Sequence, residues 1–432
     1  MGVIEKIMVA LGWRRAMPVY CRYSFRLRKY IAFQIVKKLG EKPHPERFGI
    51  VFLDWTGNSA ISEKEFANAR PWGGVDYFES PVPRGFIHVF DAPACKVKQP
   101  RFCGLAMWYN WDRMFVFKKL FGHLPDARRG KIRQVENENG SLDLRGSESS
   151  AVIRNSRIDE IIIDGEIDSI QIEASAVVEK ISDSSQGEKL RLTLSTKKIL
   201  YPGLEKLKDL TIDDAEEINL NDVTEFYPTL QTLSIHGKPG SIAGFDALRK
   251  LPNLEVFWCF NMCGFDGSDM PGPDELPNLF HLWFEDLPND AAKRIRKTWK
   301  DADGVIVNIG KARKPEWFAE NRDNPFHDWD ERDGIPKAFA KKAFSLYKTC
   351  KTQMLALSSL PEAERPAAFA EAVRGFVAAF NVMDEKEPFI ETIEREEIYE
   401  AALDLWRLAQ KQCGLGMTED EFIDTFDNRR DW

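Results

Sequence analysis

The stretch LPNLEVFWCFN, from Leu251 to Asn261, returns 25 residues later as LPNLFHLWFED, from Leu276 to Asp286. Each copy contains an LxxLxL pattern of apolar positions, with a tryptophan between the last two of them. Two further copies precede these, and the first positions of the four copies step by 23, 24 and 25 residues. A recurrence of this length is typical of chains built from similar units that stack side by side.

The four LxxLxL segments resemble leucine-rich repeats of the bacterial type, and the resemblance covers residues 190–309. It implies units that bury their apolar edges only by stacking on their neighbours. The expected fold class is α/β: a leucine-rich repeat solenoid flanked by an α+β amino-terminal region and an all-α carboxy-terminal domain. One departure is the missing Asn three residues beyond LxL, where the chain instead has Ala215, Lys238, Met262 and Leu287.

The residues between the apolar positions of each predicted strand form a second row. Alternation along a strand sends this row to the opposite, concave face of the solenoid. Because neighbouring strands lie about 4.8 Å apart, Trp258 and Trp283 are expected side by side. Large aromatic side chains often dominate the binding energy of interfaces. The predicted partner-binding residues are Ser234, His236, Val256, Trp258, Phe260, His281, Trp283 and Glu285.

An alternative for this row stays open at this point. A flanking domain that folds over the concave face would make both tryptophans ordinary internal packing.

A second ambiguity lies upstream, where IIIDG and IQIEA start nine residues apart. This spacing predicts either degenerate repeats or a β-hairpin that caps the first unit.

The chain divides into three predicted domains. Residues 1–150 are expected to begin with helix and continue as a mixed α+β region of unknown fold. Residues 151–314 hold the repeats and their capping strands, and residues 315–432 a connector and a helical domain. Apolar periodicity and capping signals in this last part predict helices over 337–354, 366–380 and 389–412, a C-cap at Gly414, and a capping box of Thr418 and Glu421.

Charge and composition limit the classes of partner. The net charge of −8 and the pI near 5.5 argue against a nucleic-acid-binding protein, which relies on clustered Lys and Arg. Residues 1–50 carry eleven Lys or Arg against three Glu, a balance of +8, and residues 384–432 carry fifteen carboxylates against six bases, a balance of −9. Two solvated helical faces explain this asymmetry. Contact of the basic amino-terminal run CRYSFRLRKYIAFQIVKKLG with an anionic membrane surface is the alternative.

The compartment follows from cysteine usage and hydropathy. The seven cysteines are scattered and odd in number, which favours a reducing compartment. No window approaches 18 consecutive apolar residues, so no transmembrane segment is predicted. We therefore expect a cytoplasmic protein. The carboxylates of Glu391, Glu394, Glu397, Glu400 and Asp404 are expected to form a solvated acidic face rather than a di-metal site.

The sequence favours a non-catalytic interaction protein that binds a partner protein through the concave face. The resemblance implies a bacterial immunity or accessory factor. The competing hypothesis is an enzyme with its active site in residues 45–125 and the repeats as a substrate-recruiting arm. Asp54 is its candidate residue, because a carboxylate at a strand end is where α/β sites lie. The chain has no Gly-rich phosphate loop, GxSxG or HExxH, so no catalytic residue, cofactor or metal is predicted.

Overall fold

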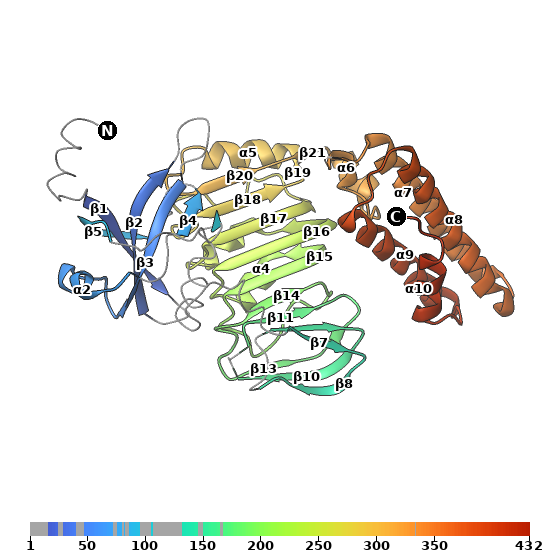
Figure 1. Cartoon of the computed structure of the whole chain (residues 1–432), viewed down its shortest axis with the longest axis horizontal. Coiled ribbons are helices and arrows are strands. Elements are labelled where there is room, and N and C mark those ends of the chain that lie inside the picture. The colour runs from blue at the N-terminus through green and yellow to red at the C-terminus, as the bar shows by residue number, and fades with distance from the viewer. Residues whose placement is uncertain are drawn as a thin grey trace. The chain divides into compact units, whose positions relative to one another are not determined.

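The structure is a computed structural model of the 432-residue chain, and it separates into two compact units, Met1–Pro315 and Glu316–Trp432 (Figure 1). The residues that it describes are 16–24, 29–39, 47–71, 76–79, 82, 86–95, 105–106, 132–145, 150–164, 167–332 and 334–432.

The first unit begins with a six-stranded sheet. Its strands, in spatial order, are β5 (Ile87–Pro93), β1 (Ala16–Ser24), β2 (Lys29–Leu39), β3 (Arg47–Gly57), β4 (Asp76–Glu79) and β6 (Leu105–Ala106). All neighbours are antiparallel except β4 and β6. The short helix α2 (Glu63–Asn68) follows β3 and starts with a capping box between Ser62 and Glu65.

The expectation that the chain starts with helix is wrong for the basic run, which folds as the antiparallel strands β1 and β2. The reason is that this sheet is covered on both faces. Val19 and Cys21 of β1 are buried in a core on one face, whereas Phe33 and Ile35 of β2 are buried in a core on the other. With apolar residues on both sides, the period-2 signal of a strand is weak in the sequence. Residues 1–15 and 107–131 of this region lie outside the described residues.

A nine-stranded parallel sheet forms the centre of the first unit (Figure 1). Its strands follow one another in chain order: β7 (Ile132–Glu136), β9 (Ser150–Arg154), β11 (Ser169–Ile172), β14 (Arg191–Leu194), β15 (Asp209–Asn219), β16 (Thr232–Ala243), β17 (Val256–Cys263), β18 (His281–Glu285) and β20 (Ile306–Ile309). The short strands β19 (Leu287–Pro288) and β21 (Ala312–Arg313) pair separately.

At its amino-terminal end, this sheet shares a core with a smaller parallel sheet. Its strands are β8 (Asn139–Asp143), β10 (Arg157–Ile163), β12 (Val177–Val178) and β13 (Ile181–Asp183). Because β10 pairs with β8, β12 and β13, whereas β11 pairs with β9 and β14, IIIDG and IQIEA belong to different sheets. The β-hairpin alternative is therefore wrong.

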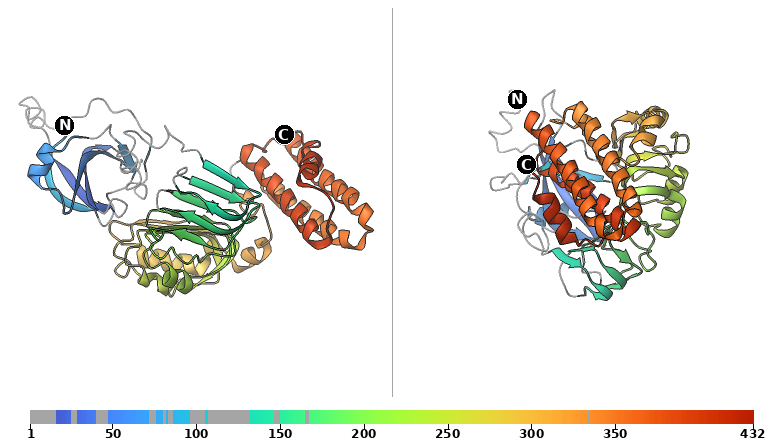
Figure 2. Two further views of the ribbon diagram at one scale, coloured as in Figure 1. Left: turned by 90° about the horizontal axis from the view of Figure 1, so that it is seen from below. Right: turned by 90° about the vertical axis from the view of Figure 1, so that its right-hand side faces the viewer.

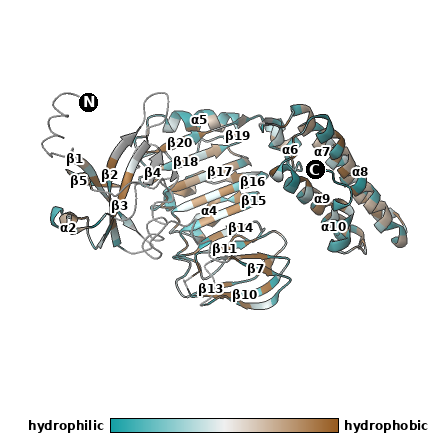
Figure 3. Ribbon diagram, viewed as in Figure 1, coloured by the Kyte–Doolittle hydropathy of each residue, from teal (hydrophilic) through white to brown (hydrophobic). Residues whose placement is uncertain are grey.

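Helices cover one face of the large sheet. The elements α4 (Leu220–Phe226), η3 (Phe245–Lys250) and α5 (Asn289–Trp299) follow β15, β16 and β18, and Figure 2 shows them along the same side of the strands. Their side chains Val223, Leu248 and Ile295 are buried in one core with strand residues such as Phe257 and Leu282. Hydrophobic positions along these strands appear in brown in Figure 3.

The predicted leucine-rich repeat solenoid is wrong: residues 132–313 form an α/β unit around a nine-stranded parallel sheet. The LxxLxL spacing matches only β15 to β18. At the amino-terminal end of the sheet the chain alternates between two sheets, and the connection between β17 and β18 has no helix. The sequence pattern correctly predicts which residues of these strands are buried. Strands of a parallel sheet are buried in the same way without a uniform repeating unit, so the pattern alone does not indicate a solenoid.

The second unit is helical. It contains α6 (Pro315–Asn321), η4 (Trp329–Glu331), α7 (Lys337–Ala356), η5 (Leu357–Ser359), η6 (Glu362–Glu364), α8 (Arg365–Lys386), α9 (Thr392–Cys413) and α10 (Glu419–Asp427). The three long predicted helices are confirmed, although α8 is longer than expected. Gly414 ends α9 with a φ of 58°, and Thr418 and Glu421 form the predicted capping box of α10.

The expected acidic face of α9 is wrong for Glu394, which is buried. The Arg332 guanidinium donates to Glu394 at 2.9 Å and to Glu397 at 2.7 Å, and the Trp329 indole N–H donates to Glu397 at 2.7 Å. An arginine from a distant connector therefore neutralises part of the carboxylate cluster. The spacing along α9 alone does not show such a partner.

Candidate binding site on the open face of the large sheet

The large sheet has two chemically different faces. Alternation along β15 to β18 sends one set of side chains into the core beneath the helices and the other set to the opposite side. We call this opposite side the open face. Its residues are Thr211, Asp213, Ser234, His236, Val256, Trp258, Phe260, His281, Trp283 and Glu285.

Three aromatic rings form a cluster on the open face. Trp258 and Trp283 are directly paired in the β17–β18 register, as expected, and their ring centroids lie 5.7 Å apart. Phe260 packs edge-on against Trp283 at 5.1 Å and parallel to Trp258 at 6.2 Å. All three side chains are partly exposed. The cluster therefore presents apolar surface at positions that face away from the core beneath the helices.

The six-stranded sheet covers one end of the open face. Val256 and Phe280, at the start of β17 and just before β18, are buried in one core with Phe33 and Phe52 of β2 and β3, and Trp258 packs partly against that core. This end of the row is internal packing.

A buried ion pair fixes the same contact. Arg22 of β1 pairs with Glu255, which precedes β17, and the Arg22 side chain is only 5% exposed. The Arg22 guanidinium also lies 5.5 Å from the Phe280 ring centroid and 4.7 Å from that of Phe86. The aromatic rings and the carboxylate replace much of the hydration that the guanidinium loses on burial.

His281 is buried beneath the aromatic cluster, with 1% of its surface exposed. Its Nδ1 lies 3.3 Å from the Trp258 indole nitrogen and its Nε2 lies 3.2 Å from the Asn308 amide. Because an indole N–H can only donate, His281 Nδ1 accepts from Trp258, and in the neutral imidazole the single proton lies on Nε2, on the side of the Asn308 amide. Burial lowers the pKa of His281 to about 4, so the ring is neutral at physiological pH.

A polar chain borders the aromatic cluster. His236 Nδ1 lies 2.8 Å from Asp213 Oδ1, and His236 Nε2 lies 2.8 Å from Ser234 Oγ. The carboxylate can only accept, so Nδ1 carries the proton and donates to it, whereas Nε2 of the neutral ring accepts from the serine hydroxyl. The imidazole also stacks on Phe260, with centroids 4.9 Å apart and planes 17° apart. The ring of His236 is thus held in one tautomer and one orientation.

Glu285 is held at the opposite border. Its carboxylate accepts from the Trp283 indole N–H and from the Lys311 backbone N–H, both at 3.2 Å. It lies directly over Gly310, where an added Cβ would meet the carboxyl group at 2.0 to 2.3 Å. The glycine therefore leaves the space that this carboxylate occupies.

The structure thus divides the eight predicted residues. Val256, His281 and Ser234 are buried, at 1%, 1% and 3% exposure, whereas the other five are partly exposed. The sequence-based prediction did not include Asp213, Arg22, Phe280, Asn308 and Gly310, which the structure places at this site. Only Asp213 had a readable signal, because it lies 23 residues before His236, one step of the recurring spacing.

The competing enzyme hypothesis stays an untested prediction. Its candidate residue, Asp54, is exposed on β3. Much of residues 72–131 lies outside the described residues.

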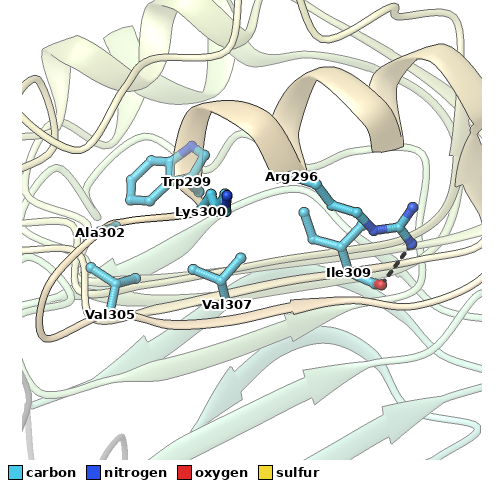
Figure 4. Close-up of a pocket in the computed structure, with 7 residues that line it drawn as sticks. All are labelled: Arg296, Trp299, Lys300, Ala302, Val305, Val307 and Ile309. Carbon is cyan, nitrogen blue, oxygen red and sulfur yellow. Dashed lines mark hydrogen bonds between the residues drawn. The ribbon is translucent and has the colours of Figure 1, made fainter.

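A cavity of about 450 Å³ lies between α5 and β20 (Figure 4). None of the predicted site residues contributes to it. The Arg296 guanidinium at its rim is engaged, because it donates to the carbonyl oxygens of Ile309 and Gly310 at 2.9 Å each. The lining residues are Arg296, Trp299, Lys300, Ala302, Val305, Val307 and Ile309.

Comparisons with protein families, curated proteins and solved structures find no match for this chain. Within the part of the chain that the structure describes, every helix is too short or too polar to cross a membrane. The described residues also contain no group of three or more His, Cys, Asp or Glu side chains placed to hold a metal ion.

Proposed function

We propose that this protein binds another protein through the exposed end of the open face, made of His236, Phe260, Trp283 and Glu285. The observation that carries the proposal is the partly exposed ring cluster. Strand alternation explains the buried row of these strands, and the six-stranded sheet packs against Trp258, but neither explains the partly exposed rings of Phe260 and Trp283 on the opposite side. Aromatic side chains that lose their remaining water on binding are the usual source of interface energy.

The charges around the rings define the partner's chemistry. Asp213 has a side-chain exposure of 33%, and Glu285 is also partly exposed, so two carboxylates border the cluster. The chain as a whole carries a net charge of −8. The favoured partner segment therefore presents an Arg or Lys between apolar side chains. Its cation would lie over the indole or phenyl rings and approach the carboxylates, and each such contact contributes on the order of 1 kcal/mol.

The rigidity of the surface supports the same proposal. Glu285 and the Trp283 ring constrain each other through their hydrogen bond, and Phe260 is stacked between neighbouring rings. Side chains that are already ordered lose little conformational entropy on binding. Much of the contact energy is therefore retained as affinity.

The test is a binding measurement with purified components. A partner captured by cross-linking on wild-type protein is purified, and its dissociation constant is measured for wild type, Trp283→Ala, Phe260→Ala and the control Trp317→Ala. Trp317 is a partly exposed tryptophan of the helical unit. We expect each open-face variant to weaken binding at least about tenfold and the control to bind like wild type. Unchanged affinity of the Trp283→Ala, Phe260→Ala double variant, with an unchanged melting temperature, would refute the proposal.

A further inference from the structure

Partner binding gives no reason for the order of groups in the polar chain of Ser234, His236 and Asp213, although His236 and Asp213 lie at the proposed binding surface. The order is a hydroxyl, an imidazole and a carboxylate, joined by two contacts of 2.8 Å. This is the arrangement in which a general base activates a nucleophile while a third group holds the base in the correct tautomer. Sequence motifs do not reveal it, because the three residues come from two neighbouring strands and not from a GxSxG turn.

We infer that Ser234, His236 and Asp213 form a nucleophilic acyl-transfer site on the open face, which accepts activated esters or thioesters with an apolar acyl group. Ser234 is the nucleophile and His236 the general base. Asp213 is a positioning residue, since it acts through the imidazole. This activity goes beyond partner binding and does not depend on it.

The strand geometry explains how the site is built. Ser234 and His236 are two residues apart on β16, so both side chains lie on the open face. Asp213 lies on the adjacent strand β15, next to His236, and Phe260 of β17 stacks on the other side of the imidazole. A base held by a carboxylate and by a ring face cannot rotate away from the hydroxyl. The chain of contacts is therefore preorganised.

The surroundings of Ser234 select the substrate. Its register neighbours are Thr211 on β15 and Trp258 on β17, and only 3% of the residue is exposed. Such low exposure disfavours large polar substrates, and we expect only a small carbonyl group to approach the hydroxyl. An apolar acyl chain would lie along Trp258 and Phe260, the near edge of the ring cluster.

The reaction is an acyl transfer without a change of oxidation state. Ser234 Oγ attacks the acyl carbon and forms a C–O bond, while its proton moves to His236 Nε2. The bond to the phenolate or thiolate leaving group breaks, and that group takes the proton. Water then attacks the acyl-serine, gives its proton to His236 Nε2, and restores the serine when the proton returns to Oγ.

The leaving group has to be activated because oxyanion stabilisation is weak. Ser234 lies within a strand that is paired on both sides, so its backbone N–H is committed to the sheet ladder. Loss of a single oxyanion donor costs roughly 10² to 10³ in rate in a serine hydrolase. Peptide and alkyl amide bonds are therefore too unreactive for this site, and aryl esters or thioesters remain.

The experiment uses the full chain without any partner. The protein is treated with a small dialkyl fluorophosphate, in which Ser234 Oγ displaces fluoride at phosphorus, and the modified residue is mapped by peptide mass spectrometry. Turnover of p-nitrophenyl acetate is measured in parallel. We expect modification at Ser234, and we expect His236→Gln to lower its rate at least about 100-fold without a change in melting temperature.

Two further variants separate a positioning role from a structural one. Asp213→Asn removes the charge and is expected to slow modification at least about tenfold, and Asp213→Glu is expected to restore part of the rate at the same melting temperature. Ser182→Ala is the matched control, because Ser182 also lies on a strand and donates to a carboxylate, that of Glu160, at 2.5 Å. No modification in excess reagent, modification elsewhere only, or an equal rate in His236→Gln would each overturn the inference. Partner binding that fails while Ser234 reacts would refute the proposed function alone.

Discussion

The two faces of the sheet at β16, β17 and β18 carry side chains with different environments. On the core face, Phe257 and Leu282 are fully buried in a hydrophobic core. On the open face, the residues between them make ring contacts and hydrogen bonds, and several keep part of their surface exposed. The core face is determined by packing alone. At one end of the open face the side chains are packed beneath the six-stranded sheet. At the other end, aromatic rings and polar groups keep part of their surface exposed.

This difference shows why a recurring apolar pattern carries little information about function. The pattern reports the row that must be buried for the sheet to form. Binding surface and reactive groups lie on the other row, where the sheet tolerates many residue types. Variants that act on one face and not on the other therefore test the comparison directly.

The largest effect is expected from the core face. Phe257 is fully buried and packs against the rings of Phe245 and Phe284, with centroids 6.0 and 5.8 Å away. Phe257→Ala should lower the free energy of unfolding by about 3 to 5 kcal/mol, because it leaves a cavity in a rigid core. Urea denaturation measures the change. Phe260→Ala, on the open face, is the control, and an equal loss there would remove the distinction between the faces.

The covered end of the open face should behave like core. Arg22→Ala leaves Glu255 buried without its partner, and we expect a loss of about 3 kcal/mol in the free energy of unfolding. The double variant Arg22→Met, Glu255→Leu replaces both charges by apolar groups and should recover most of that loss. Hydrogen exchange of β17 and β18 gives a second readout. Wild-type stability in Arg22→Ala would show that the ion pair does not hold the two sheets together.

His281 makes the free energy of unfolding depend on pH. Its pKa in the folded state is about 4, below the unfolded value of about 6.5, so the folded protein binds fewer protons between these values. The stability contributed by the neutral ring is complete above pH 6.5 and declines as the pH falls towards 4. At pH 4.5 the loss is on the order of 2 to 3 kcal/mol.

The measurement for His281 is urea denaturation at pH 7 and pH 4.5, for wild type and for His281→Gln. Other groups titrate in the same window, so the difference between the two proteins is the relevant quantity. The variant should lose clearly less stability on acidification than the wild type does. Equal losses would mean that His281 is protonated at little cost in the folded state.

The smallest effect on stability is expected at Gly310. Its Cβ would displace only the end of the Glu285 side chain, so Gly310→Ala should change the free energy of unfolding by less than about 1 kcal/mol. Binding of the partner should nevertheless weaken severalfold, because the carboxylate leaves its position beside Trp283. Gly375→Ala is the matched control: a Cβ there meets nothing within 4 Å, and helix propensity predicts slight stabilisation. Unchanged binding in Gly310→Ala would exclude Glu285 from the contact.

Individual strands and helices were predictable from local patterns, although the fold class was not. The four LxxLxL segments became four neighbouring strands, and Trp258 became the direct partner of Trp283. The helices of the carboxy-terminal unit were also predictable, since the capping box at Thr418 and the C-cap at Gly414 are local signals. These features depend on residues close in sequence, for which periodicity and capping chemistry are sufficient.

The global architecture was not predictable in the same way. The solenoid was inferred from four similar segments, although the sheet has nine strands and a second sheet packs beside its first members. The β1–β2 pair was taken for helix because both of its faces are buried, which hides the alternation of a strand. Similar local burial can arise in different architectures, so apolar spacing alone does not distinguish them.

Local spacing was enough to determine which residues of LPNLEVFWCFN face the core and which face away, because that division follows from the two-residue period of a strand. It did not determine what lies over the outward residues. Folding buries Val256 beneath the six-stranded sheet of residues 16–106 and leaves Phe260 partly exposed. These outcomes depend on contacts between segments far apart in the chain, and such contacts leave no periodic trace in the sequence.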